Sequence, residues 1–305
     1  MYDIIVIGGG PAGLSAALYA GRYNLSCLLL AGIAGQGSAV NAWLVENYPG
    51  YSKTSGPYLL NQMTKQVESG GAQIIQEEVI EISQADKNFI VKTPSKSYQG
   101  KTLIYATGTK HRQLGLPNED SLIGKGISYC TTCDGPLFKD KIVGIIGGGD
   151  ASIKAALLLN KFAKTLYLIT REKELRAEGG NFKELSQTKT IVIYQTTVSE
   201  LITQDNRLKG IKISPSYQNN DTLLLDGLFV EIGGIPNTGL IDDLGIKKND
   251  HGYIIVDENM STNINGLFAA GDVTTAFGDF KQIIMAAASG AFAAYNAHKF
   301  LEKSK

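Results

Sequence analysis

Two cysteines and an acid stand together near the middle of the chain, in Cys130-Thr131-Thr132-Cys133-Asp134-Gly135. Two thiols separated by two residues can close into a small disulfide ring. The rate at which a thiol exchanges with other sulfurs depends on how much of it is ionised. An adjacent acid that gives or takes protons therefore affects this rate. The motif therefore predicts a redox-active dithiol that moves electron pairs.

A glycine-rich turn precedes this dithiol at the start of the chain. An apolar strand at 2–7 is followed by Gly8-x-Gly10-x-x-Gly13, an Ala- and Leu-rich helix at 14–23 and a second strand at 25–30. This order is typical of a dinucleotide-binding fold, in which glycines allow the helix N-terminus to meet a pyrophosphate. The sequence therefore predicts a dinucleotide site here.

One expected feature of that fold is missing from this part of the chain. Dinucleotide folds often place an acid after the second strand, where it holds the ribose hydroxyls. The segment 28–41 contains neither Asp nor Glu. We therefore expect the ribose to be held differently, through the backbone of 32–37.

The same pattern recurs after the dithiol. A strand at 141–146 precedes Gly147-x-Gly149-x-x-Ser152, a helix at 153–162 and a strand at 165–169. Ser152 stands where Gly or Ala is usual and is small enough to be tolerated. The repeat predicts an α/β fold with two Rossmann-like, three-layer nucleotide-binding domains.

The last part of the sequence resembles the first, with a strand at 266–272 and an Ala-rich helix at 282–301. The second domain is therefore predicted to be inserted into the first. We expect a discontinuous domain at 1–112 and 237–305 and an inserted domain at 113–236 that carries the dithiol. Two connections between domains make a hinge geometrically possible.

Composition excludes several classes of protein. The 305 residues are 43% hydrophobic with a formal net charge of +0, so no nucleic-acid partner is expected. We also expect no membrane segment and no signal peptide, and a cytoplasmic location. Three cysteines do not make a secreted disulfide scaffold, and Cys27 is expected to be a small buried hydrophobe. His111, His251 and His298 are scattered, so no metal site is expected.

A set of segments in this order resembles the low-molecular-weight thioredoxin reductases over essentially the whole chain. The segments are Gly8-x-Gly10-Pro11-Ala12-Gly13, Glu46-Asn47-Tyr48-Pro49-Gly50, Ala106-Thr107-Gly108, Cys130-x-x-Cys133-Asp134-Gly135, Gly147-Gly148-Gly149-Asp150, and Ala270-Gly271-Asp272-Val273 with Lys281-Gln282-Ile283. The resemblance implies a homodimer with FAD in the first domain. It also implies that electrons pass from the flavin through the dithiol to thioredoxin or a thioredoxin-like protein.

The resemblance further implies residue roles. Cys133 faces the flavin, Cys130 attacks the substrate disulfide, and Asp134 protonates the departing thiolate. The residues implied to bind FAD are Gly8, Gly10, Pro11, Ala12, Gly13, Gln36, Asn47, Thr107, Gly108, Gly271, Asp272, Lys281, Gln282 and Ile283. Those implied to bind a pyridine nucleotide are Gly147, Gly149, Arg171 and Arg176. Because the dithiol cannot touch the flavin and a bulky partner at once, a domain rotation is expected.

The chain departs from the family at Thr170-Arg171-Glu172, where NADPH-using members carry His-Arg-Arg. Several cations are needed to bind a 2′-phosphate. An anion at Glu172 should repel that phosphate and could instead accept from a ribose hydroxyl. Three electron donors therefore stay open: NADPH, NADH and reduced ferredoxin or another donor that is not a nucleotide.

Alternative functions also stay open. The segment Asp272-Val273-Thr274-Thr275 resembles the peroxiredoxin-reductase flavoproteins as well, which allows peroxiredoxins or low-molecular-weight disulfides as substrates. A flavin-bound redox sensor without turnover is a third class. Phe277 and Phe280 could stack on a cofactor, but we interpret them as filling the dimer interface.

Overall fold

The chain forms two compact units, Met1–Lys110 with Ile235–Lys305, and His111–Gly234. The computed structural model describes residues 1–33, 37–42, 45, 47–176, 179–278 and 280–303, and for Ser38, Asn41, Thr132 and Cys133 only the backbone. The chain passes between the units twice, and the two connecting strands, β7 (Thr109–His111) and β16 (Gly234–Pro236), pair with each other.

A seven-stranded sheet forms the core of the first unit, in the order β3-β2-β1-β6-β5-β4 with β17 also paired to β6. Its neighbours β3, β2, β1, β6 and β17 are parallel, and β5 and β4 continue it antiparallel. Parallel strands bring their carboxyl ends to one edge, where loops can meet a ligand. The strands are β1 (Tyr2–Ile7), β2 (Cys27–Leu30), β3 (Gln73–Ile75), β4 (Glu81–Ala85), β5 (Asn88–Lys92), β6 (Ser97–Tyr105) and β17 (Leu267–Ala269).

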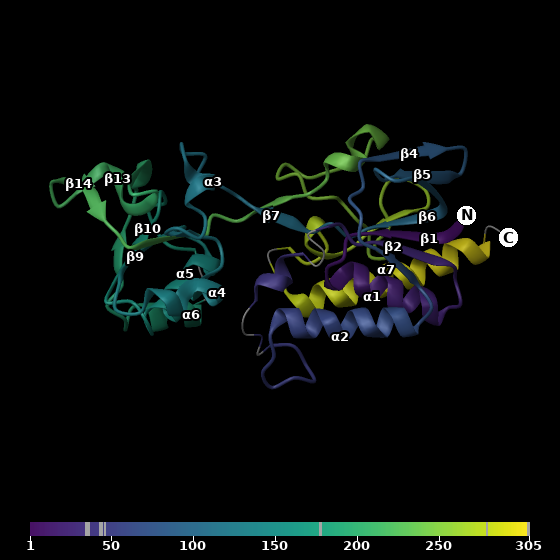
Figure 1. Cartoon of the computed structure of the whole chain (residues 1–305), viewed down its shortest axis with the longest axis horizontal. Helices are drawn as coiled ribbons and strands as arrows, with labels where there is room; N and C mark the ends of the chain where they lie inside the picture. The colour runs from purple at the N-terminus through teal and green to yellow at the C-terminus, as the bar shows by residue number, and fades with distance from the viewer. Residues whose placement is uncertain (34–36, 43–44, 46, 177–178, 279, 304–305) are drawn as a thin grey trace. The chain divides into compact units, whose positions relative to one another are not determined.

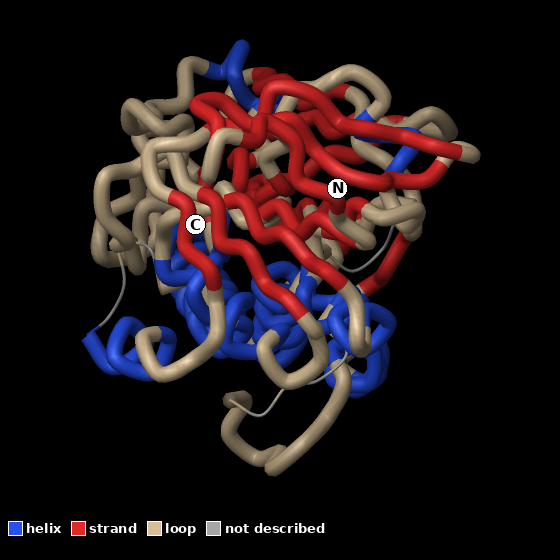
Figure 2. Tube along the Cα trace, turned by 90° about the vertical axis from the view of Figure 1, so that its left-hand side faces the viewer, coloured by secondary structure: helices blue, strands red, loops and turns tan. Residues whose placement is uncertain are grey.

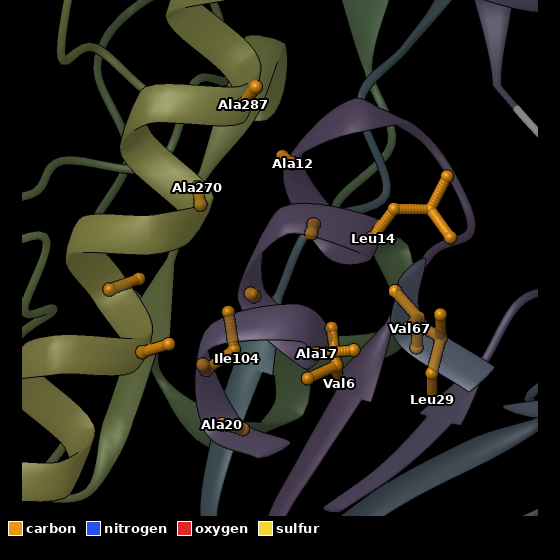
Figure 3. Packing of buried hydrophobic residues seen from close by; sticks show 14 of the residues in the cluster. Val6, Ala12, Leu14, Ala17, Ala20, Leu29, Val67, Ile104, Ala270 and Ala287 are labelled. Carbon is orange, nitrogen blue, oxygen red and sulfur yellow. The ribbon is translucent and has the colours of Figure 1, made fainter. Parts of the chain in front are cut away.

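Three helices, α1 (Pro11–Arg22), α2 (Gly56–Ser69) and α7 (Ile283–Lys303), lie together along this sheet (Figure 1). Side chains of β1 alternate between faces, so Ile4 and Val6 join the core cluster that contains these helices. Ile5 joins a second cluster with residues of β5 and β6. Figure 3 shows small alanines where α1 and α7 meet, which allows the two helices to approach closely. The short 3-10 helices are η1 (Ser38–Asn41), η3 (Gly239–Leu244) and η4 (Gly271–Val273).

The second unit contains a parallel five-stranded sheet in the order β11-β10-β9-β15-β8 and an antiparallel three-stranded sheet in the order β12-β13-β14. Figure 2 shows strands running side by side with loops leaving their ends. The strands are β8 (Ile127–Ser128), β9 (Ile142–Ile146), β10 (Thr165–Ile169), β11 (Ile191–Ile193), β12 (Thr197–Gln204), β13 (Arg207–Tyr217), β14 (Asn220–Leu224) and β15 (Gly227–Val230). The helices are α3 (Glu119–Leu122), α4 (Thr131–Asp134), η2 (Gly135–Phe138), α5 (Asp150–Leu159) and α6 (Gly179–Leu185).

The sequence also predicts strands at 74–82 and at 252–256, and the structure differs from both predictions. The strand predicted at 74–82, with alternating polar residues, is interrupted, because β3 and β4 lie at opposite edges of the sheet and the chain must cross between them. The segment 252–256 makes only isolated bridges, from Ile254 to Lys248 and to Thr274. Gly252 has a φ of +83°, which is not an extended conformation. The strand pairing at Ile254 therefore does not continue towards the N-terminus through Gly252. Within the described ranges, no helix has both the length and the apolarity needed to cross a bilayer.

Candidate functional site

The first glycine turn packs too tightly for side chains. Gly8 has a φ of +113°, and a Cβ there would lie 2.3 Å from the carbonyl oxygen of Ala106. A Cβ on Gly13 would lie 1.8 Å from the carbonyl oxygen of Gly8. Gly10 precedes α1, Pro11 opens it, and its first turn contains no acid. A helix N-terminus of this kind suits a pyrophosphate.

The end of β17 and helix α7 both pack against the first glycine turn. Gly271 has a φ of +77°, and a Cβ there would lie 2.9 Å from Cβ of Ala12. A Cβ on Gly290 of α7 would lie 1.9 Å from the carbonyl oxygen of Ala12. The structure thus brings Gly8, Ala12, Gly13 and Gly271 into one small region, although they come from both ends of the chain.

Polar side chains from three further segments lie in the first unit. The amide of Asn47 donates to Oε1 of Gln282 at 2.9 Å, directly before Ile283 opens α7. The Lys281 ammonium donates to the carbonyl oxygen of Thr274 at 2.6 Å. Burial raises the pKa of the Asp272 carboxyl, and the positive charge of Lys281 opposes that rise. Asn47 and Gln282 are therefore neighbours in space, while Gln36 lies outside the described residues.

Thr107 and Gly108 form hydrogen bonds with Asn237, where the chain re-enters the first unit. The Thr107 hydroxyl donates to the carbonyl oxygen of Asn237 at 2.7 Å, and the Asn237 N–H donates to the carbonyl oxygen of Gly108 at 3.0 Å. The Tyr105 hydroxyl donates to the same Asn237 oxygen at 2.9 Å. The structure therefore gives the Thr107 side chain a backbone partner of its own.

An acid that sequence reasoning missed lies beside the end of β2. Oε1 of Glu78 accepts the N–H of Ile33 at 3.0 Å and lies 3.1 Å from the position of a Cβ on Gly32. Glu78 follows β3 instead of β2, so it stands far in sequence from the place where an acid is usual. A carboxylate at this position can accept hydrogen bonds from ribose hydroxyls.

The redox motif begins at the carboxyl end of β8. Cys130 is disulfide-bonded, and the side chain of Cys133 lies outside what the structure describes. The Cys130 N–H donates to Oγ of Ser128 at 3.0 Å, and the Asp134 N–H donates to the Cys130 carbonyl oxygen at 3.1 Å. Cys27 is a free thiol in the core, and burial raises its pKa to about 12, as expected of a structural thiol.

The second glycine turn differs from the first at its helix. Gly147 has a φ of +151°, and Ser152 is fully buried with its hydroxyl donating to the Gly149 carbonyl oxygen at 2.7 Å. The first turn of α5 carries an acid, Asp150, which pairs with Lys154 at 2.6 Å. A carboxylate at this helix end competes with an anionic ligand for the same N-terminal N–H groups.

The segment after β10 lies against this second turn. A Cβ on Gly148 would lie 2.3 Å from Oγ1 of Thr170 and 3.3 Å from Cγ of Glu172. Oε1 of Glu172 accepts from Arg176 at 2.8 Å and from Arg171 at 3.4 Å. The two arginines are exposed by 74% and 80%, so each ion pair is weak, yet one carboxylate stands beside both cations.

No three His, Cys, Asp or Glu side chains gather as metal ligands in the part of the chain that the structure describes. The arrangement offers instead a glycine turn fit for a dinucleotide, a disulfide-bonded cysteine beside an acid, and a second glycine turn bordered by Glu172.

Comparisons with known proteins agree with this arrangement. The family model for pyridine nucleotide-disulphide oxidoreductases matches residues 2–292. The thioredoxin reductase of Listeria monocytogenes is 36% identical over 308 residues, which cover 100% of this chain and 95% of the relative. A crystal structure of Lactococcus lactis thioredoxin reductase in its FR conformation has a TM-score of 0.88 at 33% identity, covering 99% of this chain and 100% of that chain.

A second similar structure is that of a reductase named for ferredoxin and flavin. The ferredoxin-flavin thioredoxin reductase of Clostridium acetobutylicum has a TM-score of 0.54 at 29% identity, covering 99% of this chain and 98% of that chain. The predicted α/β fold with two Rossmann-like domains is confirmed by these matches. The chain, with its glycine turns in both units and its Cys130 disulfide, is an oxidoreductase that belongs to the low-molecular-weight thioredoxin reductases.

Proposed function

We propose that the protein is a FAD-dependent disulfide reductase that passes electrons through the Cys130–Cys133 dithiol to thioredoxin or a thioredoxin-like protein. The observation that carries the proposal is the Cys130 disulfide, which lies within a Cys-x-x-Cys-Asp motif in a chain with a tightly packed dinucleotide turn. The relatives named thioredoxin reductase support the same substrate class.

The residues of the first unit fit FAD. Gly8 and Gly13 allow the turn to pack tightly, and Gly10 directly precedes α1, whose N-terminus suits a pyrophosphate. We propose that Asp272 and the Asn47–Gln282 pair hold the flavin side and that Glu78 accepts from the ribose. When bound, FAD supplies the electron pair that the disulfide takes up.

Each residue of the redox motif has its own role in the proposed thiol–disulfide exchange. The Cys130 thiolate attacks one sulfur of the partner disulfide, forming a mixed disulfide and releasing the other partner sulfur as a thiolate. Asp134 gives that thiolate its proton. The Cys133 thiolate next attacks Cys130, which restores the internal disulfide and releases the reduced partner. The electron pair has then moved from the dithiol to the partner, with one S–S bond formed for each one broken.

Flavin binding can be tested at the first glycine turn. The substitution Gly13→Ala places a methyl group 1.8 Å from a backbone oxygen, so α1 must shift away from the turn. We expect at least about tenfold less bound flavin per chain, measured from the ratio of flavin to protein absorbance. Gly149→Ala is the matched control, since nothing lies within 4 Å of a Cβ there.

Equal flavin content in Gly13→Ala and the wild type would contradict the assigned site. Circular dichroism of both variants separates loss of flavin from loss of folding. A Gly13→Ala protein that stays folded without flavin is the result that supports the proposal most directly.

We infer that the preferred electron donor carries no 2′-phosphate. Glu172 lies beside Arg171 and Arg176 and cancels part of the positive charge that a 2′-phosphate needs. Its Cγ also lies against Gly148, the position from which a carboxylate can accept from a ribose hydroxyl. NADH is therefore favoured over NADPH, and reduced ferredoxin is the second candidate because a relative is named for it.

An anaerobic titration of the yellow protein distinguishes these donors. We expect the flavin absorbance to fall with NADH or reduced ferredoxin at concentrations at least about tenfold below those needed with NADPH. Stoichiometric bleaching by NADPH at the lowest concentrations would contradict the inference.

The family resemblance also leads us to propose a cytoplasmic homodimer. Phe280 is 55% exposed within the chain, which suits a side chain covered by a second copy.

A further inference from the structure

A partly buried carboxyl group in the second unit has no part in the proposed exchange. Glu231 directly follows β15, and its N–H donates to the carbonyl oxygen of Ile146 at 2.8 Å. Its own carbonyl oxygen would lie 2.3 Å from a Cβ on Gly147. The backbone of Glu231 is therefore fixed between the end of β9 and the second glycine turn.

The side chain of Glu231 reaches the redox motif. Oε1 of Glu231 accepts the hydroxyl hydrogen of Thr131, and the two oxygens are 2.7 Å apart, although the residues are separated by 100 positions. Thr131 is only 6% exposed and directly follows Cys130. The pair joins the first residue of α4 to the residue that follows β15 in the five-stranded sheet.

A second carboxylate, that of Glu119, is buried and contacts Tyr129, the residue before Cys130. Oε1 of Glu119 accepts from the Tyr129 hydroxyl at 2.5 Å, and its two oxygens accept from the N–H groups of Leu114 and Gly115 at 2.8 Å each. Several donors thus satisfy Glu119, and the Glu231 carboxyl accepts from the Thr131 hydroxyl. Carboxyl groups therefore contact the residues on both sides of Cys130, Tyr129 and Thr131.

The charge of Glu231 is expected to change near neutral pH. Burial raises the pKa of its carboxyl to about 7, and the Thr131 hydrogen bond opposes that rise. The acids on the neighbouring helices are Asp134 on α4 and Asp150 on α5, the latter paired with Lys154. Below this pKa Glu231 is neutral, and above it a negative charge lies one hydrogen bond from the residue after Cys130.

We propose that Glu231 is a positioning residue for the redox disulfide, which it holds through Thr131 and whose reduction its negative charge makes less favourable. The inference rests on the proposed function. Reduction adds two electrons to the sulfurs, breaks the S–S bond and leaves thiols or thiolates that take protons from water. A nearby carboxylate disfavours the thiolate form, so it shifts the equilibrium towards the disulfide.

The test measures the dithiol–disulfide equilibrium of the purified flavoprotein in anaerobic glutathione buffers at pH 6 and pH 8.5. Alkylation followed by mass spectrometry counts the free thiols, and Cys27 stays protonated and buried throughout. At pH 8.5 we expect Glu231→Gln to favour the dithiol about tenfold, equivalent to about 30 mV. At pH 6, where the wild-type carboxyl is already neutral, we expect less than about a twofold difference.

Substitutions at Thr131 separate positioning from folding. Thr131→Val removes the hydrogen bond that lowers the Glu231 pKa, so it should shift the equilibrium at pH 8.5 in the same direction as Glu231→Gln. Thr131→Ser keeps a hydroxyl and should restore the wild-type value. Thr222→Val is the matched control, because it removes a Thr–carboxylate hydrogen bond of 2.9 Å to the exposed Asp221 on β14. Flavin content reports folding of every variant.

Equal equilibrium constants for wild type and Glu231→Gln at both pH values would overturn the inference. So would a shift of the same size at pH 6 and pH 8.5, since a purely structural effect does not follow the charge of Glu231. A wild-type protein without any exchangeable dithiol would overturn the proposed function along with it, and the two failures are thereby distinguishable.

Discussion

Replacing Cys130 by Ser should leave the flavin reducible by its donor and should lower disulfide turnover at least about a thousandfold. The hydroxyl of serine has almost the same size, so the fold is retained, but it does not ionise near neutral pH and cannot form a mixed disulfide. The measurement is steady-state reduction of an oxidised thioredoxin, with flavin bleaching followed separately under anaerobic conditions.

Cys27→Ala is the matched control for this substitution. The Cys27 thiol is buried with its pKa raised to about 12, so its removal should leave turnover unchanged. If the Cys130→Ser protein keeps more than about a tenth of wild-type turnover, the attacking role of Cys130 is wrong. Parallel assays with a peroxiredoxin and with small disulfides compare the alternative substrates, and a wild type inactive on all of them would indicate a redox sensor.

The double substitution Thr170→His with Glu172→Arg should raise the preference for NADPH over NADH at least about a hundredfold. It removes the carboxylate that now pairs with Arg171 and Arg176 and adds a third guanidinium beside them. Each hydrogen bond between a charged donor and a phosphate contributes about 1.5–3 kcal/mol, so two of them are enough for this ratio. The measurement is the anaerobic rate of flavin reduction by each nucleotide after rapid mixing.

Glu174→Arg makes the same charge change two positions along the chain and serves as the control, because Glu174 is exposed. It should change the ratio only slightly. An unchanged ratio in the double variant would show that the second glycine turn does not select the donor, and reduced ferredoxin would then become the leading candidate.

Local sequence patterns predicted the elements around the first glycine turn well. The apolar run of β1, the turn at Gly8 and the start of α1 depend on neighbours within a few residues, and these are visible in the sequence. The interruption at 76–80 was not visible, because it follows from the placement of β3 and β4 at opposite edges of one sheet. Pairing across a sheet depends on residues distant in the chain.

The missed acids share the same cause. Glu78 lies beside Gly32, and Glu231 bonds Thr131 across 100 positions, so no spacing in the sequence marks either one. Asn47 and Gln282 were selected by family resemblance alone, and the structure adds that their side chains contact each other. Chemistry that depends on long-range contacts needed the structure.

The close approach of Gly290 to Ala12 has a consequence for the order in which the protein is made. The first glycine turn is covered by helix α7, which the ribosome produces after the second unit. The second unit is one continuous segment, His111–Gly234, and can acquire its shape while the chain is still emerging. The first unit must wait for helix α7, so the packing around the first glycine turn is completed only after the second unit has been synthesised.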